Sequence, residues 1–290
     1  MKLRWWERLL GKKARLWRLA RDVRAYYGGL PPDRVSEEER EVLGYLETRG
    51  IDILPYRFQD EYPAEGPEVF EDASVGLHYM MWDGRRLYHR PTRRPERVRR
   101  YFRGLQIEQD PRSPHRYLDA EFDVEPGDTV LDVGAAEGNF GLSVVERAGR
   151  VVLFEPSPVW AGPLAATFAP WKDKVRIVGR AVSDERSGGT VRLDDAVGEG
   201  ERVDFIKIDV EGNEERVLRG AAGLIGRQER MRIAVCTYHR QDDAGRLSGM
   251  LEGMGFRVRF TPGYLLYHHG RGNELRPPYL RRAVLRASRG

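Results

Sequence analysis

Asp132, Gly134 and Gly138 have the types and the spacing of a turn that binds a small charged ligand. They lie in TVLDVGAAEGNF at residues 129–140, where a short apolar run predicts a buried strand that enters a glycine turn and then a helix. An acidic residue before such a turn suits an ammonium group, and the amino end of the helix suits a carboxylate. S-adenosylmethionine carries both groups, and the Gly-x-Gly-x-x-Gly spacing of dinucleotide sites is absent. The alternative is an ordinary glycine turn of another α/β protein.

Polar residues also end the next two apolar runs. Glu155 ends the run 150–155, about twenty residues after the glycine turn, where a carboxylate can accept hydrogen bonds from both ribose hydroxyls of an adenosyl ligand. Ser183 and Asp184 follow the run 175–182, where an adenine amino group would lie. Asp184 is equally explained as a turn residue before a pair of glycines.

An aspartate and a histidine follow two further predicted strands. Asp209 and Glu211 lie at the carboxyl end of the run VDFIKIDV over 203–210, and His239 follows the run 231–238. Because ligands of open α/β sheets bind at the carboxyl ends of the strands, these side chains are expected on the rim that carries the glycine turn. His239 is the candidate general base for an acceptor hydroxyl, and Asp209 orients it or shares the task. The alternative is a divalent ion held by Asp209, Glu211 and His239, since carboxylates and imidazole are metal ligands.

The apolar runs alternate with helical patterns, which predicts a doubly wound parallel sheet. After Asp209, a helix is expected from Glu214 to Leu224, with Gly220 inside it. Before the sheet, Ser36 is expected to cap a helix that ends near Arg49. A hairpin is expected over 78–88 around Asp-Gly, followed by a helix over 95–106.

Six pieces of the chain resemble the FkbM-type family of S-adenosylmethionine-dependent O-methyltransferases. They are VLDVGAAEGNF, FEP, AVSD, RLDD, VDFIKIDVEGNEERVLRGA and YHRQDD, in this order within residues 106–268, and SPHRY at 113–117 is also similar. The resemblance implies an α/β fold of the Rossmann-like class I methyltransferase type, and methyl transfer to a hydroxyl of a sugar, glycan or secondary metabolite. It places at the cofactor Asp132, Gly134, Ala135, Gly138, Asn139, Glu155, Ser183 and Asp184, and at the acceptor Asp209, Glu211 and His239.

Two departures from the family pattern concern the acceptor. The segment 185–191 between AVSD and RLDD is shorter than in many relatives, so substrate contacts made there are expected to be missing. Several branches of the family place a glutamate before the histidine of the last motif, whereas here Tyr238 precedes His239.

Length and composition agree with one catalytic domain plus an extension. The chain has 290 residues, of which 40% are hydrophobic, and is expected to divide into a helical extension over 1–74 and a methyltransferase domain over 75–290 with an Arg-rich tail. Cys236 is the single cysteine, which excludes an intramolecular disulfide and a cysteine cluster for zinc, and a buried apolar role is expected for it. Beyond the alternative set of Asp209, Glu211 and His239, no metal ligands are assigned, and His115 is left open between packing and function. No apolar run suits a spanning helix or a signal peptide, so a cytoplasmic protein is expected.

Basic residues gather in three segments of a chain whose net charge is +4. Residues 1–27 carry nine Lys or Arg, residues 84–103 carry nine Arg and residues 271–290 carry six Arg. A basic collar on an acidic core would attract phosphate, anionic saccharide, lipid headgroups or RNA, although Arg-rich composition alone also explains it. An RNA methyltransferase is thus one alternative function, but no RNA-binding module is recognisable. A non-catalytic binding protein of the same fold is the other.

Residues 1–27 have a helical pattern with an apolar side and a basic side, and contain three of the six tryptophans. The pattern is typical of an interfacial helix on an anionic membrane, which would make the protein peripheral to the membrane. A helix that docks on the catalytic domain has the same pattern, since apolar stripes usually face a core.

Overall fold

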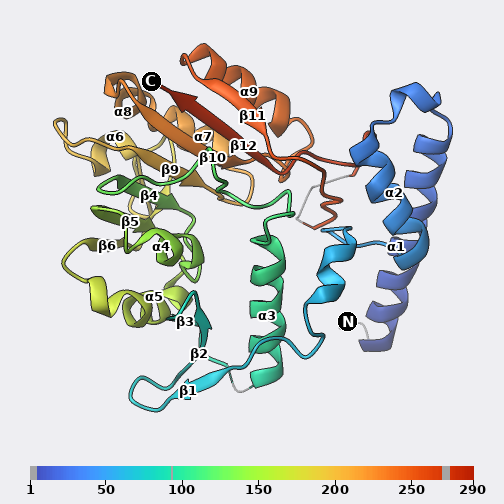
Figure 1. Ribbon diagram of the computed structural model, residues 1–290, viewed down its shortest axis with the longest axis horizontal. Coiled ribbons are helices and arrows are strands. Elements are labelled where there is room, and N and C mark those ends of the chain that lie inside the picture. Colours follow the sequence, from blue (N-terminus) through green and yellow to red (C-terminus); the bar gives the residue numbers. More distant parts are fainter. Residues whose placement is uncertain (1–4, 93, 270–274) are drawn as a thin grey trace.

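The computed structural model describes residues 5–92, 94–269 and 275–290, and its centre is a seven-stranded sheet (Figure 1). The strands follow one another across the sheet in the order β11-β12-β10-β9-β4-β5-β6. All neighbours among β10, β9, β4, β5 and β6 are parallel, and β12 runs antiparallel to both β10 and β11. The seven strands are β4 (Thr129–Val133), β5 (Arg150–Phe154), β6 (Val175–Val178), β9 (Phe205–Ile208), β10 (Met231–Cys236), β11 (Arg257–Phe260) and β12 (Val284–Arg289).

The sheet is covered on both faces, because alternate residues of its strands enter two separate apolar clusters. Val130 lies in one cluster and its neighbour Leu131 in the other, as expected for successive side chains of a strand. The first cluster includes side chains of α4 (Asn139–Val144) and α5 (Ala161–Phe168), and the second includes side chains of α6 (Leu193–Ala196) and of three further helices on the opposite face. These are α7 (Glu214–Arg219), α8 (Ala222–Arg227) and α9 (Asp243–Gly253). The predicted α/β fold with a doubly wound, mostly parallel sheet is confirmed.

Two local predictions about the sheet and its helices were wrong. The run 175–182 was expected to be one strand, but β7 (Ala181–Val182) is separate and pairs with β8 (Thr190–Val191) in a small parallel sheet. The helix from Glu214 to Leu224 breaks at Gly220, where a Cβ atom would collide with the backbone carbonyl of Ser183. The break therefore follows from the close approach of two backbones at a glycine.

The remaining elements lie mainly before the sheet. Ser36 caps α2 through a capping box in which its hydroxyl accepts from the Glu39 amide and Glu39 accepts from the Ser36 amide. The hairpin turns at Asp83 and Gly84, both with positive φ, as predicted. The elements are α1 (Trp5–Gly28), α2 (Glu37–Arg49), β1 (Phe70–Asp72), β2 (Leu77–Trp82), β3 (Arg85–Tyr88) and α3 (Pro95–Glu108), with α6 (Leu193–Ala196) later and four short 3-10 turns, Pro32–Arg34, Arg57–Glu61, Pro158–Trp160 and Ala169–Trp171.

The end of α1 packs against residues near the end of the chain. Val23 and Tyr27 are buried in the same apolar cluster as Leu280, and the Tyr26 ring meets the Tyr279 ring edge-on. Figure 1 shows α1 and α2 side by side at the edge of the molecule. The docking interpretation therefore holds for the last turns of α1, whereas Trp17 is 67% exposed. Residues 1–4 of the predicted helix lie outside the described residues.

Membrane association of α1 stays a prediction, and the exposed residues give it a test. We expect the full chain to float with phosphatidylserine vesicles at low salt, because each Lys or Arg near an anionic surface contributes ~1 kcal/mol. Reversing two exposed charges, Lys13→Glu with Arg18→Glu, should weaken the association at least about tenfold. The matched control is Arg97→Glu with Arg100→Glu on exposed positions of α3. Absence of wild-type protein from the floating fraction would leave α1 with its docking role alone.

None of the helices within the described ranges has the length and apolar character needed to cross a membrane.

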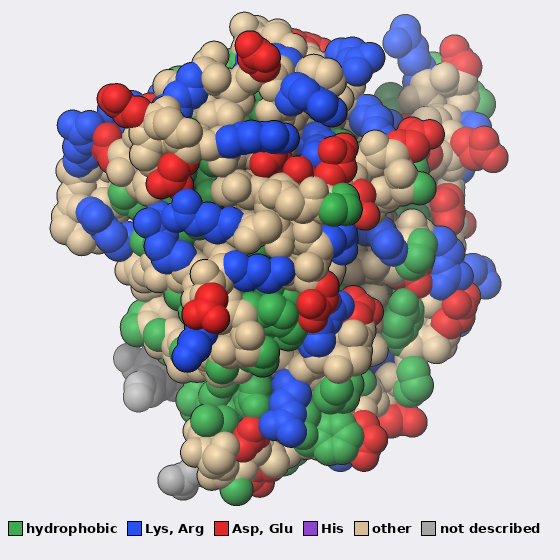
Figure 2. All heavy atoms as spheres, turned by 60° about the vertical axis from the view of Figure 1, so that its left-hand side comes forward, with side chains coloured by type: hydrophobic (Ala, Val, Ile, Leu, Met, Phe, Trp, Pro, Cys, Tyr) green, Lys and Arg blue, Asp and Glu red, His purple; other side chains and the backbone are tan. Residues whose placement is uncertain are grey.

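The predicted basic collar is wrong at two arginines of the C-terminal segment, because these side chains are buried in the fold. Arg281 and Arg286 are each 4% exposed and donate hydrogen bonds to backbone carbonyls. Figure 2 shows Lys and Arg side chains interspersed with Asp and Glu over one face of the molecule.

Candidate active site

A cavity of about 520 Å³ opens at the carboxyl ends of the strands. Its size is within the range of roughly 300–1,000 Å³ that small-molecule sites occupy. Five of the residues predicted from the sequence line it, together with backbone and side chains of β7 and of the turn after β9. The five are Gly134, Glu155, Ser183, Asp209 and Glu211.

The glycine turn brings the end of β4 against the end of β9. Gly134 has a φ of +82°, and a Cβ atom there would collide with the carbonyl oxygen of Asp209. Gly138 has a φ of +88°, and a Cβ atom would lie 2.7 Å from the Phe168 ring. Both positions therefore require glycine, one for close approach of two strands and one for packing of the helix.

The other predicted residues of the turn do not line this cavity. Ala135 is buried, and its amide donates to the carbonyl of Phe154. Asn139 lines a separate cavity beside α3, and its side-chain oxygen accepts from the Phe140 amide. The cofactor contacts predicted for Ala135 and Asn139 therefore stay predictions, because neither residue lines this cavity.

Asp132 faces a buried lysine. Its carboxylate is fully buried and lies 3.1 Å from Nζ of Lys207, which also donates to the carbonyl of Gly134 at 2.6 Å. Burial lowers the pKa of Lys207, but the carboxylates of Asp132 and Asp209 outweigh that effect and raise it. The charge of Asp132 is thus matched within the protein, so a contact with a cofactor ammonium group would have to compete with Lys207.

Glu155 presents a carboxylate at the end of β5, on the cavity wall. One oxygen accepts from the Ala136 amide at 2.9 Å, and the other accepts from the Ser157 amide at 2.8 Å. A carboxylate has about four lone-pair sites, so each oxygen can accept one further hydrogen bond. These contacts fix the side chain where the ribose was predicted to lie.

Ser183 and Asp184 follow β7, and the Ser183 hydroxyl donates to Asp184 at 3.2 Å. Ser183 lines the cavity, and Asp184 lies outside it in an ion pair with Arg216, at 2.7 Å. That hydrogen bond lowers the pKa of Asp184, so its carboxylate stays charged and engaged at the surface. Arg216, which follows the turn after β9, also lines the cavity. It was not identified as a site residue from the sequence.

Asp209 is the centre of the polar network at the cavity. Its Oδ1 lies 3.5 Å from Nε2 of His239, and its Oδ2 accepts a hydrogen bond from the Tyr117 hydroxyl at 2.8 Å. Burial raises its pKa, but the charges of Lys207 and His239 outweigh burial and lower the pKa to about 2. Asp209 is therefore ionised, and the structure brings it together with His239 as expected.

His239 is held by a glutamate that the sequence motifs did not identify. Glu214 Oε1 lies 2.8 Å from His239 Nδ1, and the same oxygen accepts from the amides of Val210 and Gly212. Because the carboxylate accepts, Nδ1 must carry the ring proton, and Nε2 is left as the basic nitrogen beside Asp209. Burial lowers the pKa of His239, but the hydrogen bond with Glu214 and the charge of Asp209 outweigh it and raise the pKa.

Glu211 has an unusual backbone and no place in the metal clusters of the described residues. It has a φ of +56°, it is exposed, and it lines the cavity. The groups with metal-ligand spacing are Asp209 with Glu214 and His239, and Asp209 with His115 and Cys236. The alternative set of Asp209, Glu211 and His239 is not among these groups, and Glu214 stands in the place of Glu211.

His115 and Cys236 join the site from the segment before β4 and from the end of β10. His115 Nε2 lies 3.0 Å from the Tyr238 hydroxyl and 3.9 Å from Oδ2 of Asp209. Burial lowers the pKa of His115 to about 4, so its ring is neutral near pH 7. Two histidines therefore flank the two oxygens of Asp209, and their pKa values are shifted in opposite directions.

Comparison with known proteins gives one family and a group of distant folds. Residues 176–258 match the family described as the methyltransferase FkbM domain. A search of curated proteins gave no match. Precorrin 8w decarboxylase from Methanobacterium thermoautotrophicum has 19% identity and a TM-score of 0.38, over 57% of this chain and 83% of that one. Precorrin-6y C5,15-methyltransferase from Geobacter metallireducens has 15% identity and a TM-score of 0.38, over 58% and 83%.

An rRNA methylase from Streptococcus thermophilus has 13% identity and a TM-score of 0.36, over 57% of this chain and 88% of that one. The matched segment 176–258 contains Asp209, Glu214 and His239, and ends within β11. This family match identifies residues 176–258 as part of a methyltransferase FkbM domain and confirms the resemblance that the sequence motifs predicted.

Proposed function

We propose that the protein transfers a methyl group from S-adenosylmethionine to a hydroxyl group of a sugar, glycan or secondary metabolite. The observation that carries the proposal is the cavity at the carboxyl ends of β4, β5 and β9, whose wall holds Glu155 and the ionised Asp209. The cofactor brings a methyl group on a positively charged sulfur. The match to a methyltransferase family supports the reaction class, and the hydroxyl acceptor is the proposal's own extension.

The residues present fit an adenosyl ligand. Glu155 has one unused lone-pair site on each oxygen for a ribose hydroxyl, since each oxygen accepts one backbone amide. Ser183 supplies a small polar side chain to the same cavity, where its hydroxyl donates to Asp184 at 3.2 Å and keeps its lone pairs as acceptors. Asp209 supplies a negative charge that favours a cationic group in the cavity. Glu155 and Ser183 would hold the adenosyl part, and Asp209 would lie nearest the reacting end.

Proton removal from the acceptor is assigned to His239. Glu214 holds Nδ1–H, so Nε2 points its lone pair toward the space beside Asp209. An acceptor hydroxyl that donates a hydrogen bond to Nε2 would lose its proton to His239 as its oxygen takes the methyl carbon and the bond from that carbon to sulfur breaks. Such a base contributes ~10² to 10⁴ in rate, and alignment of the reacting groups contributes more, about 7–11 kcal/mol of the barrier.

Glu155 gives the proposal its binding test. We expect Glu155→Ala to weaken S-adenosylhomocysteine binding at least about tenfold, because charge-assisted hydrogen bonds contribute ~1.5–3 kcal/mol each and ~1.4 kcal/mol is one decade. Glu155→Gln keeps one oxygen for the backbone amides and should lose less affinity. Calorimetric titration checks both variants, and Glu229→Ala, at an exposed glutamate before the amino end of β10, is the control. Equal affinity in Glu155→Ala and wild-type protein would remove Glu155 from the cofactor site.

A further inference from the structure

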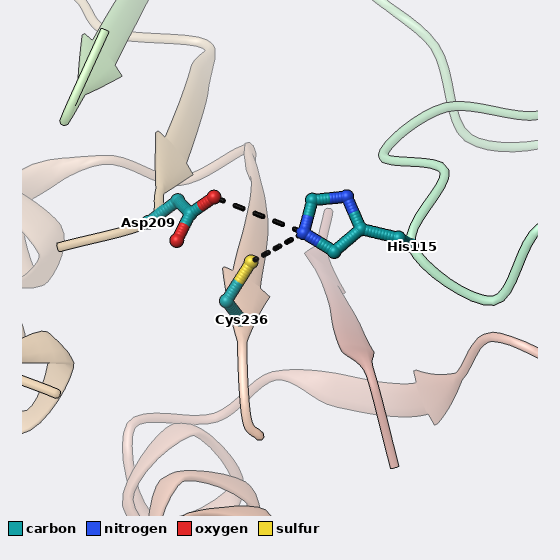
Figure 3. A group of neighbouring side chains, drawn as sticks. All are labelled: His115, Asp209 and Cys236. Carbon is teal, nitrogen blue, oxygen red and sulfur yellow. Dashed lines mark hydrogen bonds and ion pairs between the residues drawn. The ribbon is translucent and has the colours of Figure 1, made fainter. Parts of the chain in front are cut away.

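We propose that His115, Asp209 and Cys236 form a zinc site with an open fourth coordination position. The three side chains come from the segment before β4, the turn after β9 and the end of β10, and Figure 3 shows them pointing toward one another. The site differs from the set of Asp209, Glu211 and His239 considered from the sequence, and it gives Cys236 a role beyond packing. The metal assignment stands independently of the methyl-transfer reaction.

The separations of the ligand atoms fit a metal ion of zinc's size. Nε2 of His115 lies 3.9 Å from Oδ2 of Asp209 and 3.9 Å from Sγ of Cys236, and one ligand atom from each residue lies within 4.8 Å of the others. Zinc bonds of ~2.0–2.3 Å at tetrahedral angles place neighbouring ligand atoms about 3.3–3.8 Å apart. Shifts of a few tenths of an ångström would therefore close the three groups on an ion.

The donor set selects zinc among the common divalent ions. A thiolate is a soft ligand that magnesium and calcium avoid, and zinc takes cysteine, histidine and carboxylate ligands together. Three protein ligands with a vacant fourth position are typical of catalytic zinc sites, whereas structural sites have four. The composition of the cluster thus indicates a catalytic type of site.

Charge and burial also favour a divalent ion here. Cys236 is fully buried and His115 is 6% exposed, so Cys236 is a neutral thiol without a cation and would release its proton on binding one. Lys207 is the cation near these groups, but its charge is matched by Asp132 at 3.1 Å. A divalent ion would balance the two negative charges of Cys236 and Asp209.

Surrounding groups hold two of the ligands in place. The Tyr117 hydroxyl donates to Asp209 at 2.8 Å, and the Gln109 side-chain amide lies 3.4 Å from Nδ1 of His115, where its oxygen would have to face the N–H of a metal-bound imidazole. Such outer contacts orient ligands and are typical of metal sites. The Tyr238 hydroxyl lies 3.0 Å from Nε2 of His115, so metal binding would exchange this hydrogen bond for a metal bond.

The second cluster of the site is less suited to a metal. In the group of Asp209, Glu214 and His239, Oε1 of Glu214 already accepts from two backbone amides and lies 2.8 Å from His239 Nδ1. This oxygen is therefore engaged in fixing the turn and the imidazole ring. A metal on Oε1 would compete with these three contacts, whereas a metal on Nε2 of His115 would displace the Tyr238 hydroxyl.

The open position gives the zinc a role that rests on the proposed function. Asp209 lies on the cavity wall, so an acceptor oxygen that reaches it could complete the coordination. Zinc lowers the pKa of bound water to ~7, and it would favour loss of the proton from a bound hydroxyl in the same way.

Cobalt substitution tests the site without any assay of activity. The full chain is treated with a chelator, dialysed, and titrated with Co²⁺ and then with Zn²⁺, followed by absorption spectroscopy and elemental analysis. We expect about one Co²⁺ per chain and a thiolate-to-cobalt charge-transfer band. Because Cys236 is the only cysteine of the sequence, such a band can come from no other residue. Zinc should displace the cobalt and abolish the band.

Variants identify the ligands. Cys236→Ser should remove the band, and Cys236→Ser and His115→Gln should each weaken zinc binding at least about tenfold, whereas His239→Gln should keep both band and affinity. Cobalt bound without the band, less than about one-tenth equivalent bound, or loss of metal in His239→Gln would overturn the site. Melting curves of each variant separate a lost ligand from a lost fold.

Titration of the same preparations with S-adenosylhomocysteine distinguishes the two proposals. Cofactor binding without metal binding would refute the zinc site alone. Metal binding with the cobalt band but without cofactor binding would support the zinc site and refute the proposed methyl transfer.

Discussion

We expect His239→Ala to lower the rate of methyl transfer by ~10² or more while the affinity for S-adenosylhomocysteine changes little. The affinity should change little because His239 does not line the cavity that is proposed to bind the cofactor, although its Nε2 lies 3.5 Å from Oδ1 of Asp209. Since Glu214 and Asp209 raise the pKa of His239, wild-type activity should rise with pH through a pKa above the ordinary histidine value. The neutral ring is the active form, so activity falls as the ring gains its proton at lower pH. Single-turnover rates across a pH series measure both effects.

Glu214→Gln serves as the positioning control for this prediction. The amide oxygen can still accept from Val210 and Gly212, but the negative charge beside His239 is lost. The pKa of His239 should fall, so the acid limb of the pH profile should move to lower pH. A purely structural histidine would leave the limb in place, and His239→Ala would then lose thermal stability but keep its rate below the melting temperature.

Lys207→Met should have the largest effect on stability, because it leaves Asp132 buried without a counter-charge. Asp132 is 0% exposed and lies 3.1 Å from the lysine nitrogen. Breaking a buried ion pair by removing one partner costs ~3–5 kcal/mol, which for a chain of this size corresponds to roughly 6–20 °C in melting temperature. Urea unfolding followed by circular dichroism gives the free energy of unfolding.

Two further variants show whether the buried charge is the cause. Combining Lys207→Met with Asp132→Asn removes both charges and keeps an acceptor for the Gly141 amide, so part of the stability should return. Arg186→Met breaks an ion pair with Asp195 in which the arginine side chain is 71% exposed, and it should cost less than about 1 kcal/mol. A double variant as unstable as Lys207→Met would show that volume, and not charge, sets the loss.

Site residues at the ends of strands were easier to predict from the sequence than site residues that enter the site only through the packing of a turn or a helix. Glu155, Asp209 and His239 were identified because parallel strands end on one rim, and the structure places all three at or beside the cavity. Glu214 was missed because an acid in the first turn of a helix is ordinary in sequence. Its burial, at 1% exposure, depends on the fold of the turn before it.

His115 and Cys236 could not be joined from the sequence, since 121 positions separate them and neither stands in a short metal motif. The break at Gly220 has a similar origin, because a glycine in a helical pattern does not reveal which backbone lies against it. Asp132 shows the reverse case. Its type and spacing predicted a contact with a ligand. In the structure β4 pairs with β9, so that Asp132 lies opposite Lys207 and forms an ion pair with it.

Transfer of an isotopically labelled methyl group tests the central claim most directly. The full chain is incubated with S-adenosylmethionine labelled in the methyl carbon and with a panel of hydroxylated sugars, glycans and metabolites, and the products are analysed by mass spectrometry and carbon NMR. We predict that the label appears in a methyl ether of at least one acceptor, and that His239→Ala forms it at least about a hundredfold more slowly. Label found only on nitrogen or carbon, or no transfer to any acceptor by a protein that binds S-adenosylhomocysteine, would contradict the proposal.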